Sequence, residues 1–379
     1  MSQIREALSG IDGNAQIFLR PMGFMESPQR FDGQNARLSN SLIWFSAVEF
    51  SAEVDGSCVA RLMIAVEQWQ DAIEALSDAQ RDRAETLYAN LQKAHAPLQL
   101  GSRILRFDQP HVMGILNMTP DSFSDGGKYL DDPQAAADSG FAMLSAGATL
   151  IDIGGESTRP NADVIWEGDE INRVVPIVER LANGGTPISI DTRKAAVMEA
   201  ALAAGAHVVN DVSALQYDKR SLEVVCAAEC PVVLMHSPSS GENPHEGGQY
   251  SNVVTDVFSA LEKRISEISA AGVKHENILV DVGLGFGKNL SDNLALINNI
   301  GMFHALGQPI LFGASRKRMI GALSNEVSVD QRLGGSIGLA ARAFDSGAQI
   351  VRVHDVAETV QLAQVWRGLR DAALTAKVP

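Results

Sequence analysis

A repeat of short apolar runs and longer helical segments constrains the fold of this chain more than any other feature. From residue 107 onward, apolar and β-branched runs alternate with segments of helical periodicity that are rich in Ala and Leu. The runs lack strict apolar–polar alternation, which is typical of strands buried on both faces of a parallel sheet. Eight such runs are present, at residues 111–117, 148–156, 187–192, 207–212, 231–237, 277–283, 309–315 and 349–355.

Eight strand–helix units within about 270 residues match the (β/α)8 or TIM barrel, an α/β fold. We therefore predict a barrel over residues 107–379. A doubly wound sheet is the second interpretation, but it usually has fewer strands and a glycine fingerprint after the first one. Here the first strand is followed by "NMTPDSFSDGG" (117–127), which contains no GxGxxG pattern.

Residues 1–106 do not join this repeat. The sequence predicts strands at 16–24, 41–54 and 58–66, an amphipathic helix at 78–95, and a hairpin-like segment at 96–110 that leads into the barrel. We therefore expect a small α+β accessory domain in front of the barrel. Its residues indicate no function.

Composition excludes several classes of protein. A chain of 379 residues that is 45% hydrophobic and 20% charged has the composition of a folded globular protein. Its formal net charge of −15 argues against a general nucleic-acid or anionic-membrane partner, since both require a clustered basic surface. The sequence has no signal-peptide pattern, no run of about 18 apolar residues and no CxxC motif. We expect a cytoplasmic protein with reduced cysteines and small-molecule substrates.

Polar residues follow every predicted strand, where barrels of this class carry their active sites. One group, Asp191, Asn210 and Asp281, combines carboxylates with an amide that both donates and accepts hydrogen bonds. This set suits a flat, nitrogen-rich heterocycle. A second, cationic or hydroxylic group suits a phosphate or diphosphate, because Arg binds phosphate in a bidentate manner; its members are Asn117, Thr158, Arg159, Arg352 and His354.

Each of these residues also has a structural interpretation. Asp191 could cap the next helix, Asn210 could be an ordinary turn residue, His236 could bridge loop backbone, and Asp152 could be buried and orient its neighbours. The loop "DVGLGFGKN" (281–289) matches neither the Walker A motif nor GxGxxG. The consecutive cations Arg316, Lys317 and Arg318 precede a helical stretch, which is unfavourable with the helix dipole, so we expect an anionic group to compensate them.

Eight motifs, in this order, closely resemble the dihydropteroate synthase family of folate biosynthesis: "MGILNMTPDSFSDGG", "LIDIGGESTRP", "SIDT", "VVNDV", "LMH", "GFGK", "ASRKRMIG" and "VRVHDV". The resemblance covers residues 107–366. It implies a (β/α)8 fold, usually as a homodimer. The implied reaction joins 6-hydroxymethyl-7,8-dihydropterin diphosphate to 4-aminobenzoate, giving 7,8-dihydropteroate and pyrophosphate with Mg²⁺.

The resemblance also implies residue roles. The implied catalytic groups are Lys317, Asp191, Asp281, Arg352 and His354. Pterin would be held by Asp191, Asn210, Met235, Asp281, Phe286 and Lys317. The diphosphate would be held by Asn117, Thr158, Arg159, Arg352 and His354, with Asn117 also contacting the metal ion, and 4-aminobenzoate by Ser315, Lys317 and Arg318.

The sequence departs from the family pattern in places. After "LMH" the segment "SPSSGENPHEGG" (237–248) differs, and Val282, Asn161 and Arg318 stand where Pro, Gly and Ser are common. We expect residues 118–127 to form a mobile lid that orders when ligand binds. Two other functions remain open: a related barrel that transfers a methyl group from methyltetrahydrofolate to a corrinoid, and a non-catalytic paralogue that binds pterin.

Overall fold

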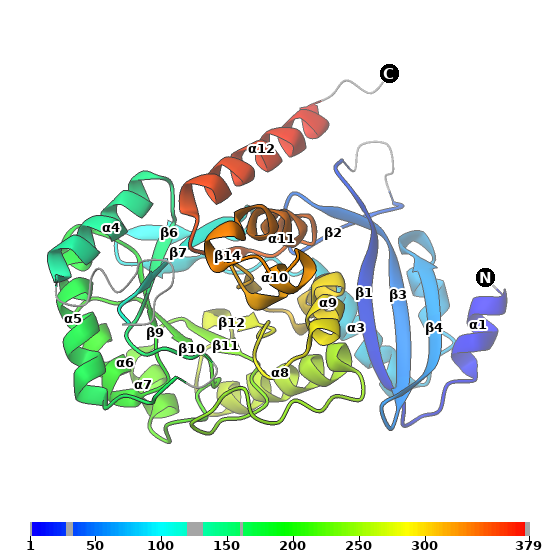
Figure 1. Ribbon diagram of the computed structural model, residues 1–379. Helices are drawn as coiled ribbons and strands as arrows, with labels where there is room; N and C mark the ends of the chain where they lie inside the picture. The colour runs from blue at the N-terminus through cyan, green and yellow to red at the C-terminus, as the bar shows by residue number, and fades with distance from the viewer. Residues whose placement is uncertain (1, 28–32, 120–131, 160–161, 376–379) are drawn as a thin grey trace.

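The computed structural model describes residues 2–27, 33–119, 132–159 and 162–375. Within them the chain forms an eight-stranded parallel barrel and, beside it, a small antiparallel sheet (Figure 1). The barrel strands are β7 (His111–Asn117), β8 (Leu150–Gly154), β9 (Ile188–Asp191), β10 (Val208–Asp211), β11 (Val232–Met235), β12 (Ile278–Asp281), β13 (Leu311–Phe312) and β14 (Ile350–Val353).

All eight predicted strands are confirmed, and the doubly wound alternative is wrong. The hydrogen-bonded order is β12-β11-β10-β9-β8-β7-β14-β13, so strands β7 to β12 follow one another around the barrel and β14, beside β13, pairs with β7. A single parallel bridge between Val280 and Ile310 joins β12 to the segment before β13 and nearly closes the barrel. Strands such as β8 are buried along their whole length, which explains their continuous apolar sequence.

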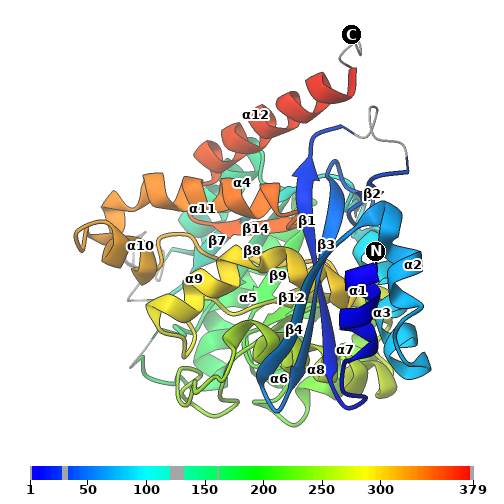
Figure 2. The same ribbon diagram turned by 90° about the vertical axis from the view of Figure 1, so that its right-hand side faces the viewer.

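Helices connect successive strands and cover the outside of the barrel (Figures 1 and 2). Their bounds are α4 (Pro133–Ser145), α5 (Glu167–Asn183), α6 (Ala195–Ala203), α7 (Ser221–Ala228), α8 (Val253–Ala270), α9 (Leu290–Asn298), α10 (Arg318–Leu323), α11 (Leu333–Asp345) and α12 (Val356–Thr375), with 3-10 turns η2 (His275–Asn277), η3 (Ile300–Leu306) and η4 (Val329–Gln331). No helix of the described ranges is long and apolar enough to cross a membrane.

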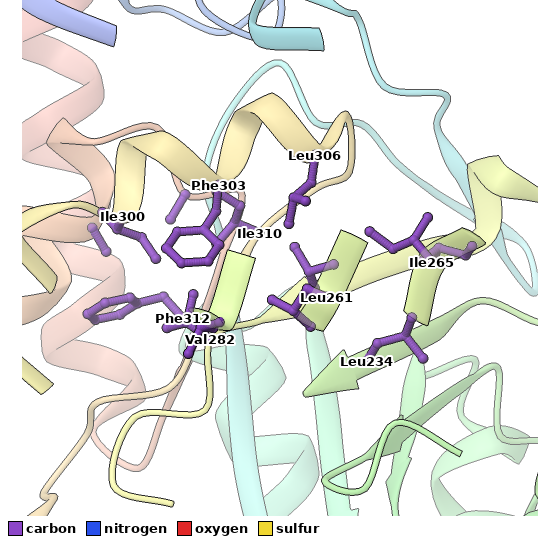
Figure 3. Close-up of a cluster of buried hydrophobic side chains, with 14 of the residues drawn as sticks. Leu234, Leu261, Ile265, Val282, Ile300, Phe303, Leu306, Ile310 and Phe312 are labelled. Carbon is purple, nitrogen blue, oxygen red and sulfur yellow. The ribbon is translucent and has the colours of Figure 1, made fainter. Parts of the chain in front are cut away.

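The barrel has two hydrophobic layers. Outside the strands, side chains of β11, α8, η3 and β13 pack together, among them Leu234, Leu261, Phe303 and Phe312 (Figure 3). Inside, a separate cluster fills the end where the strands begin. It includes residues from the predicted hairpin, now seen as β5 (Leu98–Leu100) and β6 (Arg103–Leu105). The hairpin therefore packs under one end of the barrel and leaves the carboxyl ends of the strands for the site.

The N-terminal region forms the predicted strands and helix. Its elements are α1 (Ser2–Ser9), β1 (Gln16–Met25), β2 (Ala36–Arg37), β3 (Trp44–Val54), β4 (Ser57–Ala65), η1 (Val66–Gln68), α2 (Trp69–Ile73) and α3 (Asp78–Gln92). β3 pairs with β1, β2 and β4, all antiparallel. The long helix ends at Gln92, earlier than predicted, because Lys93 adopts an extended conformation.

The N-terminal sheet packs against α8 and η3 of the barrel (Figure 2). The Phe18 and Phe258 rings meet edge to face with centroids 5.6 Å apart, and Arg83 forms two hydrogen bonds to the carboxylate of Glu262. Core residues of both parts belong to one continuous hydrophobic cluster. A domain boundary near residue 106, with an N-terminal part that folds by itself, therefore remains a proposal.

A buried histidine joins the two parts and makes stability depend on pH. The ring of His304 in η3 bonds through Nδ1 to the Ser39 hydroxyl, 3.2 Å away, and through Nε2 to the Ser346 carbonyl, 2.9 Å away. Burial lowers its pKa from 6.5 to about 4, so the folded protein holds the ring neutral. Between pH 6.5 and 4 the unfolded chain binds more protons at this position, and folding stability therefore falls as the pH falls.

We expect His304→Gln to weaken this acid dependence, because Gln can bond both serine partners without titrating. The wild-type protein should lose about 1.5 kcal/mol more of its unfolding free energy than the variant between pH 6.5 and 5. Urea unfolding at several pH values measures this difference. Parallel curves for the two proteins would contradict it.

Candidate active site

The carboxyl ends of four neighbouring strands bring polar residues into one row. Asn117, Gly154, Asp191 and Asn210 are paired in register across β7, β8, β9 and β10. Gly154 carries no side chain, and a Cβ built there would lie 3.5 Å from both Asn117 Oδ1 and Asp191 Cβ. Glycine at this position therefore leaves the Asn117 and Asp191 side chains facing the same space.

Arg352 of β14 binds the carboxylates inside the barrel. Its Nε lies 2.5 Å from Asp152 Oδ2, and its Nη2 lies 2.5 Å from Asp191 Oδ2. Asn210 Nδ2 donates to the same Asp152 oxygen, 3.2 Å away. These contacts exclude the interpretations of Asp191 as a helix cap and Asn210 as a turn residue. The first amide of α6, from Ala195, is capped by Asp218 instead.

The environment of these carboxyls shifts their protonation. Burial raises the pKa of Asp191 to about 7, an effect that the Arg352 charge opposes. Burial also raises the pKa of Asp281, and Lys317 opposes the shift. Near neutral pH, Asp191 is therefore poised between an acceptor-only carboxylate and a carboxyl that can also donate. Such a group matches the edge of a heterocycle that carries both donors and acceptors.

A second set of residues lies on the other half of the barrel. Asp281 ends β12 and is paired in register with Met235 of β11. Lys317, the N-cap residue of α10, donates from Nζ to the Leu284 carbonyl and lies over the Phe286 ring, 5.1 Å from its centroid. Burial lowers the pKa of Lys317 to about 8, although Asp281 raises it. The Phe286 ring thus forms an apolar wall beside the lysine, and Met235 neighbours the carboxylate on the adjacent strand.

His354 and Ser315 lie together at the rim. The His354 backbone N–H donates to Ser315 Oγ (3.1 Å), and the same hydroxyl is hydrogen-bonded to Nδ1 of the histidine ring (3.0 Å). Burial lowers the pKa of His354 to about 3, reinforced by the charges of Arg352, Arg316 and Arg159. The imidazole is therefore neutral at pH 7 and is not one of the cations of this group. The positive charge available to an anionic ligand at the rim comes from the neighbouring arginines.

The three consecutive cations have different environments. Arg316 pairs with Asp355 through Nε and Oδ2, 3.0 Å apart, so its compensating anion lies within the chain. Lys317 points to the Leu284 carbonyl, as above, and Arg318 is exposed. The anionic group expected for the whole run is thus needed at most for Lys317 and Arg318.

The sequence reasoning missed a buried ion network behind the Thr158 segment. Glu156 accepts from Arg193 Nε (2.9 Å) and Lys194 Nζ (2.7 Å), and Lys194 also bonds Glu170 (2.8 Å). Burial raises the pKa of Glu156, but the two cations outweigh it and the net shift is downward. The signal was available, because Glu156 and the Arg193–Lys194 pair directly follow two strand ends.

Lys288 was also missed. Its Nζ donates to the carbonyls of His236, Gly283 and Phe286 at 3.0–3.3 Å and lies 3.1 Å from His236 Nδ1. Burial lowers its pKa to about 7. His236 thus bridges loop structure, as the plainer interpretation expected, and the β12–α9 loop is held by its own lysine.

Two expectations reach beyond the described residues. Of the predicted lid at 118–127, residues 120–127 lie outside them, and so does Asn161. For the metal, no group of three His, Cys, Asp or Glu side chains able to hold an ion is found within the described ranges.

Comparison with known proteins adds independent findings. Residues 113–354 match the family model described as pterin binding enzyme. The chain is 44% identical over 276 residues to the dihydropteroate synthase of Haemophilus influenzae, covering 73% of this chain and 99% of that protein. It is 42% identical over 274 residues to that of Escherichia coli strain K12, covering 72% and 95%.

Solved structures of dihydropteroate synthases are also similar to this chain. The Xanthomonas albilineans dihydropteroate synthase with 4-aminobenzoic acid superposes with a TM-score of 0.68 at 42% identity, covering 76% of this chain and all of that one. The same enzyme in complex with 7,8-dihydropteroate gives 0.66 at 40% identity, covering 75% of this chain and all of that one. The match begins at Met113 in the family model, so the N-terminal sheet lies outside that model.

Proposed function

This chain belongs to the dihydropteroate synthase family, and we propose that it joins 6-hydroxymethyl-7,8-dihydropterin diphosphate to 4-aminobenzoate, giving 7,8-dihydropteroate and pyrophosphate. The observation that carries this proposal is the site itself. Buried carboxyls with raised pKa values meet a neutral histidine and several arginines at one end of the barrel. A heterocycle that carries a diphosphate needs both the buried carboxyls, for the ring, and the arginines at the rim, for the diphosphate.

The pterin end of the substrate fits the first half. Asp191, Asn210 and Asp281 offer acceptors and donors to the nitrogen-rich edge, and Lys317 adds a donor. Met235 and Phe286 supply apolar surface for the ring faces. When ionised, the buried carboxylates of Asp191 and Asp281 would also stabilise positive charge that develops on the ring during reaction.

The diphosphate end fits the rim, where Asn117, Thr158, Arg159, Arg352 and His354 would hold it. Mg²⁺ usually keeps several waters and takes one or two protein oxygens together with substrate phosphates. The amide oxygen of Asn117 matches that requirement, and the lack of an all-protein metal cluster in the described ranges agrees with it. Bound there, the ion would neutralise charge on the leaving pyrophosphate.

The chemistry then needs little from the protein beyond positioning. The C–O bond between the pterin methylene and the diphosphate breaks, the amine nitrogen forms a bond to that carbon, and the amine proton leaves to solvent or pyrophosphate. An aromatic amine attacks such a delocalised cation without a strong base. Orientation and electrostatics from the groups above are therefore sufficient, and no nucleophilic Ser or Cys is required.

The 4-aminobenzoate carboxylate would lie near Ser315, Lys317 and Arg318. We expect Arg318→Ala to raise the KM for 4-aminobenzoate roughly two- to tenfold with little change in kcat, because one exposed cation near a carboxylate contributes about 0.5–1 kcal/mol or slightly more. Steady-state kinetics with varied 4-aminobenzoate measure this. An unchanged KM would exclude Arg318 from the site.

Release of pyrophosphate that requires both substrates and Mg²⁺ tests the proposal. Purified protein should release none when either substrate is omitted or when EDTA is present, and activity should return with added Mg²⁺. Pterin binding without release would identify a non-catalytic paralogue. Methyl transfer from methyltetrahydrofolate to a corrinoid, without release, would support that alternative instead.

Three further features belong to this proposal: the oligomeric state, the cellular location and the domain boundary. We propose a homodimer, a cytoplasmic location, and an accessory domain that ends near residue 106. Sedimentation of the full chain reports the first. Deleting residues 1–105 tests the last: soluble, active product would make the domain dispensable, whereas aggregation would show that the sheet covering α8 and η3 is needed for folding.

A further inference from the structure

The loop between β11 and α8, residues 236–252, connects the two halves of the site. The His245 ring stacks on the Phe286 ring, with centroids 4.8 Å apart and an interplanar angle of 7°. Its Nε2 lies 2.8 Å from the Thr158 carbonyl. A carbonyl oxygen only accepts, so Nε2 carries the hydrogen. One side chain thus contacts the apolar wall on one side and the Thr158–Arg159 segment on the other.

The loop is fixed in place by polar contacts. Arg193 Nη1 donates to the carbonyls of Gly241 (3.1 Å) and Glu242 (2.7 Å). Within the loop, Ser237 Oγ donates to the Pro244 carbonyl at 2.7 Å. Because Arg193 also binds Glu156, the loop and the Thr158 segment share one anchor.

Backbone packing fixes it further. A Cβ at Gly248, whose φ is +73°, would lie 1.9 Å from the Gly287 carbonyl oxygen. The loop therefore packs backbone to backbone on the segment that carries Phe286, which only glycine permits. His245 has little freedom to move independently of either neighbour.

We propose that His245 is a positioning residue for the pterin diphosphate. Its ring stacks on Phe286, and its Nε2–H donates to the Thr158 carbonyl. These two contacts keep the Phe286 ring and the Thr158–Arg159 segment at a fixed distance from each other. This rests on the proposed function, in which Phe286 lines the pterin and Thr158 the diphosphate. It also explains why a loop that departs from the family sequence is built so tightly into the site.

Two variants separate the two contacts. His245→Ala removes both, and His245→Phe keeps the aromatic stack but loses the hydrogen bond. Equilibrium binding to the full-length protein is measured for 6-hydroxymethylpterin and for its dihydro diphosphate, with Mg²⁺ present. Glu246→Ala, a change at the neighbouring exposed residue, is the control, and melting temperatures monitor folding.

We expect His245→Ala to weaken the diphosphate ligand about tenfold and the pterin alone about threefold, since aromatic pairs and hydrogen bonds each contribute about 0.5–1.5 kcal/mol. His245→Phe should restore the pterin affinity to within about twofold of wild type but leave the diphosphate ligand weaker. Wild-type affinities in both variants would overturn the inference. Equal losses for both ligands in both variants would also overturn it, because they would indicate only a loosened loop. Binding is independent of turnover, so a wild-type protein that releases no pyrophosphate would contradict the proposed function alone.

Discussion

Replacing Lys317 with Ala is expected to lower kcat/KM at least ~100-fold while the fold stays intact. The Lys317 ammonium meets the Leu284 carbonyl and the Phe286 ring at the carboxyl end of the barrel. Its pKa, lowered to about 8 by burial, leaves it mostly charged at neutral pH. Under the proposed roles, truncation removes a donor that serves both the pterin and the 4-aminobenzoate.

Steady-state kinetics together with thermal unfolding check this expectation. Lys263→Ala, which removes an exposed lysine of α8, is the matched control and should leave both values unchanged. Asp191→Asn provides a second test with the same expected loss, because the amide can neither balance Arg352 nor accept with both oxygens. Normal turnover in Lys317→Ala or Asp191→Asn would show that the roles assigned to these residues are wrong.

The sequence predicted the barrel well because its strands are buried on both faces. Segments such as 148–156 and 277–283 are apolar runs followed by polar residues, as a strand buried on both faces requires. This pattern can be read from each segment alone, without knowing which segments pair. The shortest barrel strand, β13, shows the limit: seven residues were predicted, but only Leu311–Phe312 form the strand, and the preceding Ile310 makes the single bridge to Val280 of β12.

The sequence predicted which residues could form the site, but not which of them contact one another. The strand ends made Asp191, Asn210 and Arg352 candidates, but nothing in the sequence says that one guanidinium binds two carboxylates whose positions are 161 and 200 residues away. Charge states were equally hidden. His354 reads as a cation beside phosphate, yet burial and three nearby arginines make it neutral. Such properties arise only after folding.

Asp152 illustrates this difference best, since the sequence suggested only a buried orienting residue. The structure buries its side chain completely and gives one of its oxygens both Arg352 Nε and Asn210 Nδ2. Truncating one partner of a buried ion pair costs about 3–5 kcal/mol when the other charge is left without compensation. Arg352 keeps Asp191 as a second partner, so we expect Asp152→Ala to lower the unfolding free energy by about 3 kcal/mol, the lower end of that range, and to reduce activity sharply.

The comparison with an exposed pair isolates the effect of burial. Asp371→Asn breaks the exposed Arg367 pair on α12 and should cost no more than about 0.5 kcal/mol. Urea unfolding of both variants supplies the measurement, and similar losses would refute the structural role of Asp152.

The conservative variant Asp152→Asn tests whether Asp152 also sets the charge of its neighbour. The Asp152 charge raises the pKa of Asp191, and Arg352 lowers it. With that charge removed, Arg352 faces Asp191 alone, so the Asp191 pKa must fall from about 7. Any limb of the pH dependence of pterin binding that reports Asp191 should therefore move to lower pH in Asp152→Asn. A limb that stays in place while stability falls would make Asp152 a purely structural residue. A limb that moves would mean that this buried carboxylate tunes the site through the arginine that both aspartates share.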